Sequence, residues 1–177
     1  MTVKITYFVH GTTTDNENGI ATGQNPGELS ELGKEQSVKL KEQININDFD
    51  AVFSSDLKRA ADSARLTFGN DFIQDKRLRE CNYGDLNGSK EENVVYEEHI
   101  NSSFPKGESQ KDVEKRVRDF LNYLKENYER KHIAIVAHKS PQLALDVILK
   151  GKTWEQAIKE DWRKTKRWQP GWEYEIK

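Results

Sequence analysis

The sequence predicts an α/β protein, a three-layer α/β/α sandwich with a largely parallel central sheet. Short runs of β-branched and aromatic residues alternate along the chain with longer segments of helical periodicity. No repeat, low-complexity tract or proline-rich linker interrupts this alternation. At 177 residues, we therefore expect one domain over residues 1–177.

Four segments are predicted as strands. Residues 3–9, 50–54 and 132–137 are short and mostly apolar, which is typical of strands that helices cover on both faces. Residues 172–176 alternate between apolar and polar side chains, a pattern that predicts an edge strand.

Two of the predicted helices lie between these strands. Residues 113–128 place their apolar side chains on one helical face, and Ser109 with Asp112 is a capping box at its start. Ser55 is predicted to cap a helix that runs through residues 58–61.

Two more helices are predicted after the third strand. Ser140-Pro141 is expected to open one of them, with the Ser140 hydroxyl as N-cap and the proline in the first turn. Thr153 with Gln156 opens the other, whose apolar face continues to Trp162.

Composition restricts the classes of function. The chain has 28 Lys and Arg against 30 Asp and Glu, so its net charge of −2 does not favour binding to nucleic acid or a membrane. No apolar run approaches the roughly 20 residues of a membrane span, and no signal peptide is expected. The single cysteine, Cys81, excludes an internal disulfide and a Cys-based zinc site, and it predicts a cytoplasmic location.

Ionisable residues follow the carboxyl ends of three predicted strands. His10 follows the first, Arg59 lies one helical turn beyond the second, and His138 follows the strand at residues 132–137. Ligands of parallel α/β folds bind at this edge of the sheet, and a helix start after His138 favours an anion. Neither nucleotide-binding glycine motif is present. The pattern indicates a phosphate pocket.

Five sequence blocks stand in order across residues 3–142. They are residues 8–13 with Asn16, Gly23 and residues 29–33; residues 54–60; residues 78–88; residues 107–109; and residues 137–140. Together they resemble the blocks of the histidine phosphatase superfamily. The resemblance implies a phosphoglycerate mutase-like fold.

The resemblance also implies roles for particular residues. His10 would be the nucleophile that holds the phosphoryl group covalently. Arg59 would bind phosphoryl oxygens through its planar fork of donors, and His138 would donate a further hydrogen bond. Glu80 would protonate the leaving oxygen and then accept a proton from the attacking water. For Glu80 the alternative is a salt bridge with one of its basic sequence neighbours, and Asp85 is the alternative acid.

Smaller roles follow from the same resemblance. Thr13 and Asn16 match positions that hydrogen-bond the phosphate or the loop that holds it, and Gly11 lies in the same motif. Cationic side chains would stabilise the charge, so we expect neither a metal nor a cofactor.

Three positions depart from the family pattern. Val9 stands where the family has the first arginine of its opening motif, Thr12 replaces an acidic residue, and Lys139 replaces a glycine. An arginine that makes two charge-assisted bonds contributes about 3–6 kcal/mol, or on the order of 10² to 10⁴ in rate. We hypothesise that Lys139, beside His138, supplies part of the missing charge.

The expected function is a phosphatase that hydrolyses a small phosphorylated metabolite through a phosphohistidine on His10. A catalytically weakened or inactive phosphate-binding protein is one alternative, because of Val9. A phosphoglycerate mutase-type phosphotransferase is another. Residues 89–106 and the C-terminal segment are expected to set specificity, and the sequence indicates no oligomeric state.

All four tryptophans lie in the C-terminal segment, defined here as residues 154–177, among several Lys and Arg. We expect a helix that docks its tryptophans on the sheet and leaves the basic residues in solvent. Binding of single-stranded nucleic acid is an alternative that we do not expect. In a third interpretation, the segment lines the mouth of the site and attracts an anionic substrate.

Overall fold

The computed structural model describes residues 2–177. The strands are β1 (Val3–Val9), β2 (Ile20–Ala21), β3 (Ala51–Ser54), β4 (Ile73–Gln74), β5 (Ser89–Lys90), β6 (His132–Ala137) and β7 (Trp172–Ile176). The helices are α1 (Thr14–Glu17), α2 (Glu31–Gln43), α3 (Lys58–Phe68), α4 (Gln110–Asn127), α5 (Lys139–Lys150), α6 (Trp154–Lys159) and α7 (Trp162–Thr165).

The main sheet has the strand order β4-β3-β6-β1-β7. Strands β4, β3, β6 and β1 are parallel, and β7 pairs antiparallel with β1 at the edge, as the alternating pattern of residues 172–176 predicts. In the register, Val136 lies opposite Phe8 on one side and Ser54 on the other. The carboxyl ends of the three central strands therefore meet at one edge of the sheet.

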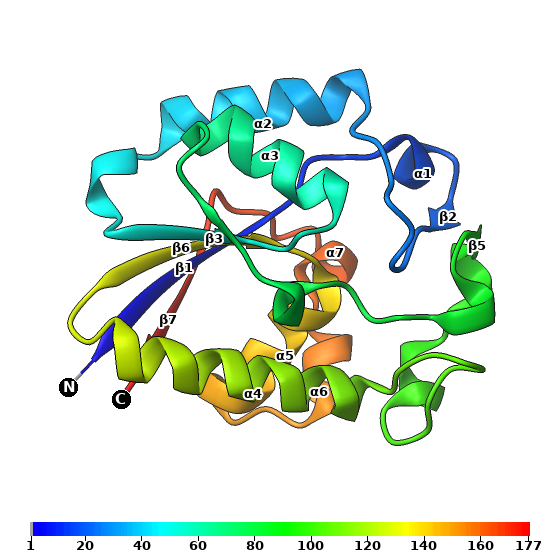
Figure 1. Cartoon of the computed structure of the whole chain (residues 1–177). Coiled ribbons are helices and arrows are strands. Elements are labelled where there is room, and N and C mark those ends of the chain that lie inside the picture. The colour runs from blue at the N-terminus through cyan, green and yellow to red at the C-terminus, as the bar shows by residue number, and fades with distance from the viewer. Residues whose placement is uncertain (1) are drawn as a thin grey trace.

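Helices cover both faces of the sheet, and this confirms the predicted three-layer fold. Figure 1 shows α2 and α3 on one face and α4, α5 and α6 on the other. Side chains alternate along the strands. Tyr7 and Ile135 join the core beneath α4 and α5, whereas Phe8 and Val136 join the smaller core beneath α2 and α3.

Capping residues set two helix starts where the sequence predicts them. The Ser109 hydroxyl accepts the Asp112 N–H, and the Asp112 carboxylate accepts the Ser109 N–H, which completes the capping box of α4. Thr153 and Gln156 do the same for α6. The predicted helices at residues 113–128 and after Thr153 are thus confirmed.

Two predicted caps are wrong. Helix α3 follows Leu57, whose side chain makes no capping hydrogen bond. The Ser55 hydroxyl accepts the N–H of Leu57, just before the helix, and not an N–H within it. Helix α5 begins at Lys139, so Ser140 is its second residue and not its N-cap. A carboxylate from a distant segment takes the free N–H groups at this helix start, as described below.

The C-terminal segment packs against the sheet with most of its tryptophans. Trp154 is buried, and Trp162 stacks on Trp172 with ring centroids 5.2 Å apart. The helix that starts after Thr153 ends at Lys159, so Trp162 belongs to α7 and not to the predicted continuation of α6. Trp168 is 54% exposed. Over residues 2–177, no helix is both long enough and apolar enough to cross a membrane.

Candidate active site

His10 follows β1 at the edge of the sheet where the central strands end. Its Nδ1 lies 2.7 Å from the carbonyl oxygen of Gly11. A carbonyl can only accept, so Nδ1 carries the proton and Nε2 keeps a free lone pair. Burial, together with the nearby Arg59 guanidinium, lowers the pKa of His10 to about 3. The imidazole is therefore neutral at physiological pH.

His138 follows β6, next to β1, and its ring centroid lies 5.0 Å from that of His10. The Tyr7 hydroxyl donates to the His138 carbonyl and fixes its backbone. Burial lowers the pKa of His138 well below its ordinary value, and the charge of the Arg59 guanidinium acts in the same direction. Both ring nitrogens are buried and lack a hydrogen-bond partner within residues 2–177. A bound ligand would supply one.

The loop after β1 lies close to the start of α2. A Cβ on Gly11 would lie 2.4 Å from the Gly33 oxygen, and a Cβ on Gly33 would lie 1.9 Å from the Thr12 oxygen. Only two glycines allow this approach. Thr13 and Asn16 form a capping box at the start of α1, so they hold the loop, and Asn16 also lines the cavity described below.

Arg59 reaches the same edge from the first turn of α3. Its Nη1 donates to the Asn25 carbonyl at 3.0 Å, and its Nη2 donates to the Gly23 carbonyl at 2.7 Å. The side chain is buried. A guanidinium has five N–H donors, so these bonds orient Arg59 and leave donors for an anion.

The Glu80 carboxylate caps the N-terminus of α5. Its Oε1 accepts the N–H groups of Cys81 at 2.8 Å and Ser140 at 3.0 Å, and its Oε2 accepts the Lys139 N–H at 3.2 Å. This carboxylate replaces the hydroxyl cap that the sequence predicts. Arg79 pairs with Asp56 instead, so the carboxylate of Glu80 remains on the cavity wall.

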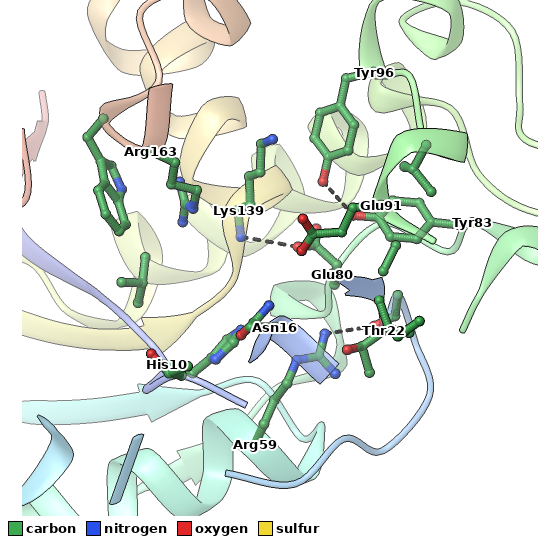
Figure 2. A pocket seen from close by; sticks show the side chains of 17 residues that line it. His10, Asn16, Thr22, Arg59, Glu80, Tyr83, Glu91, Tyr96, Lys139 and Arg163 are labelled. Carbon is green, nitrogen blue, oxygen red and sulfur yellow. Dashed lines mark hydrogen bonds between the residues drawn. The ribbon is translucent and has the colours of Figure 1, made fainter. Parts of the chain in front are cut away.

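These side chains surround one cavity of about 540 Å³ (Figure 2). Among the residues predicted for the site, His10, Asn16, Arg59, Glu80 and Lys139 line it. His138 lies beneath, against the His10 ring. The structure thus brings together both imidazoles, the guanidinium and the carboxylate, whereas Thr13 and Gly11 shape the loop. The alternative acid, Asp85, lies outside the lining and is near Lys106.

The Lys139 side chain is directed away from His10 and toward Tyr96 (Figure 2). Its Nζ lies 4.3 Å from the Tyr96 ring centroid and 3.5 Å from Asp161 Oδ2. Burial lowers the pKa of Lys139, although Asp161 opposes this shift. The hypothesis that Lys139 supplies the missing charge stays a prediction.

Sequence reasoning missed several lining residues. Tyr83 and Tyr96 line the cavity, and their hydroxyls hydrogen-bond each other. Trp162 and Arg163 come from the C-terminal segment, as its third interpretation anticipates. The clustered tryptophans and basic residues of that segment were the available signal. In the part of the chain described, no group of three or more His, Cys, Asp or Glu is placed to hold a metal ion.

The chain is similar to known proteins in both sequence and fold. The chain matches the histidine phosphatase superfamily (branch 1) over residues 7–167. A metal-independent phosphoserine phosphatase of Arabidopsis thaliana is 30% identical, and the match covers 73% of this chain and 61% of that protein. A 2,3-bisphosphoglycerate-dependent phosphoglycerate mutase of Methylorubrum populi is 29% identical, covering 81% and 77%.

Among solved structures, a mycobacterial glucosyl-3-phosphoglycerate phosphatase in complex with VO3 superposes with a TM-score of 0.76. It is 28% identical, and the match covers 89% of this chain and 86% of that one. The family match extends over most of the chain, and the range that it covers includes His10, Arg59, Glu80 and His138. The chain belongs to the histidine phosphatase superfamily, branch 1.

Proposed function

We propose that the protein is a phosphatase that hydrolyses a small phosphorylated metabolite through a phosphohistidine on His10. The observation that carries this proposal is the pair of neutral imidazoles 5.0 Å apart, one with a free Nε2 and one with two unpartnered nitrogens. Phosphatases among the relatives support the reaction class.

In the first step, the His10 Nε2 lone pair attacks phosphorus and the P–O ester bond breaks. Glu80, acting as the general acid, gives a proton to the leaving oxygen. Arg59 and His138 bind the phosphoryl oxygens while negative charge is redistributed on them.

In the second step, water attacks phosphorus and the P–N bond breaks. Glu80 takes the proton from this water, which restores both catalytic groups and releases phosphate. Neutrality of His10 is essential to the proposal, because a protonated imidazole has no lone pair for the first step.

The test is turnover of a panel of phosphomonoesters by the wild type and by His10→Ala. We expect turnover that depends on His10, together with an acid-quenched phosphoenzyme labelled from a phosphorus-32 substrate. His99→Gln is the matched control, because it removes a histidine that does not line the cavity. Turnover that persists in His10→Ala, without a labelled enzyme, would contradict the mechanism.

Two alternatives give different results in the same assay. A catalytically inactive phosphate-binding protein, which Val9 favours, binds inorganic phosphate but turns over no ester. A mutase-type phosphotransferase, suggested by the mutase relative, passes the label to an alcohol acceptor in preference to water. The cytoplasmic location expected from the single cysteine stays a prediction, as does the absence of nucleic acid among its ligands.

A further inference from the structure

A second guanidinium lines the cavity, and none of the five family blocks contains it. Arg163 lies in α7, and its side chain is 27% exposed at the cavity wall. Figure 2 shows it approaching from the C-terminal segment, whereas Arg59 approaches from the opposite side near His10.

Two neighbours hold Arg163 in place. Its Nη1 donates to Asp161 Oδ1 at 2.8 Å and to Gln142 Oε1 at 3.3 Å, and its Nη2 donates to Gln142 Oε1 at 3.4 Å. The Asp161 side chain has no exposed surface. A buried carboxylate and an amide thus orient the Arg163 guanidinium without a ligand, and its remaining N–H donors can bind one.

The group of charges around Asp161 leaves a net positive charge. Asp161 faces Lys139 at 3.5 Å and Arg163 at 2.8 Å, so one carboxylate serves two cations. Lys139 is further engaged by the Tyr96 ring. Arg163 is also among the charges that lower the pKa of both His10 and His138, so its field reaches both imidazoles.

The cavity needs such a cation. Both imidazoles are neutral, and the Arg59 guanidinium already donates hydrogen bonds to the carbonyls of residues 23 and 25. A phosphate dianion in a desolvated site requires charge-assisted donors. Val9, at the end of β1, is apolar and provides none.

We propose that Arg163 binds the phosphoryl group opposite Arg59 and supplies the charge that Val9 does not. The proposal rests on the proposed function, because it places phosphate between the same imidazoles. It assigns the C-terminal segment a direct role in the site. Asp161 and Gln142 are then positioning residues for Arg163.

The experiment measures binding of inorganic phosphate by calorimetry, and kcat/KM on the best ester of the panel. We expect Arg163→Ala to weaken phosphate binding by about tenfold to a hundredfold, as for the loss of a charge-assisted pair. Arg163→Lys should recover part of this loss. Lys164→Ala is the matched control, since it removes an equal charge from the same helix but outside the cavity lining.

Arg59→Ala separates the two proposals. Weak phosphate binding by Arg59→Ala but wild-type binding by Arg163→Ala would overturn the inference and leave the phosphatase function standing. No phosphate binding and no His10-dependent turnover by the wild type would overturn both. Should Arg163→Ala fail to unfold cooperatively, Arg163→Gln is measured in its place, because its amide keeps a donor for Asp161 and removes the charge.

Discussion

Replacing His10 by Asn should make the fold less sensitive to acid. Asn keeps an N–H donor for the Gly11 carbonyl but cannot be protonated. In the native protein, burial and Arg59 lower the pKa of His10 from 6.5 to about 3. The unfolded chain therefore binds a proton near pH 6.5 while the folded chain does not, so the free energy of unfolding falls as the pH drops below 6.5.

The size of this effect follows from the two pKa values. Between about pH 7.5 and pH 5, the folded protein takes up almost no proton at His10, whereas the unfolded chain becomes almost fully protonated there. His10 then costs about 2 kcal/mol of stability over this interval, at about 1.4 kcal/mol per pH unit below 6.5. His138 acts in the same direction, but His10→Asn leaves it in place.

The assay is urea unfolding of the wild type and His10→Asn at these two pH values. The variant should lose about 2 kcal/mol less than the wild type between them. Val117→Ala is the control, because it empties part of the buried face of α4 and keeps both imidazoles. It should be less stable at both pH values but show the wild-type difference. Equal pH differences for His10→Asn and the wild type would refute the claim that His10 stays neutral in the folded protein.

Three further substitutions have defined outcomes. Gly33→Ala should destabilise the fold by about 1–3 kcal/mol and weaken phosphate binding, because its Cβ would strike the Thr12 carbonyl and move the loop after β1. Glu80→Gln should abolish turnover and cost about 1.5–3 kcal/mol, since an amide accepts fewer of the N–H groups at the start of α5. Trp154→Phe should cost about 1–3 kcal/mol. The variant loses the hydrogen bond that Trp154 Nε1 donates to the Glu114 carboxylate. Although burial raises the pKa of Glu114, its hydrogen bonds, the one from Trp154 among them, lower that pKa overall to about 2.

Urea unfolding checks all three, with phosphate calorimetry added for the first and turnover for the second. Wild-type phosphate binding by Gly33→Ala would show that the loop tolerates the extra methyl. Full turnover by Glu80→Gln would remove Glu80 from the proposed mechanism. Unchanged stability of Trp154→Phe at neutral pH would mean that the Glu114 carboxylate finds another donor.

The sequence predicted the elements whose signals are local. The strands that end at Val9, Ser54 and Ala137 show in short apolar runs, and the two predicted capping boxes need only residues three apart. The convergence of His10 and His138 follows from parallel topology, because parallel strands place their carboxyl ends at one edge.

The sequence did not predict contacts in which a polar group from a distant segment takes the place of a local one. The start of α5 is satisfied by a carboxylate 59 and 60 positions away, and no local pattern distinguishes this from a Ser140 cap. Arg163 lies in a four-residue helix that is too short for a periodic signal. Its place in the site depends on the contacts that it makes with Asp161 and with Gln142, which lies 21 positions away.

The site separates two requirements that conflict. A nucleophilic imidazole must be neutral, which burial near cations ensures, yet a phosphoryl dianion must be attracted to the same place. Placing the positive charge on guanidiniums satisfies both, because arginine keeps its proton in surroundings that remove one from histidine. Arg59 lowers the pKa of His10 and His138 and is itself oriented by backbone carbonyls. The same field that keeps His10 reactive therefore draws the anion to it.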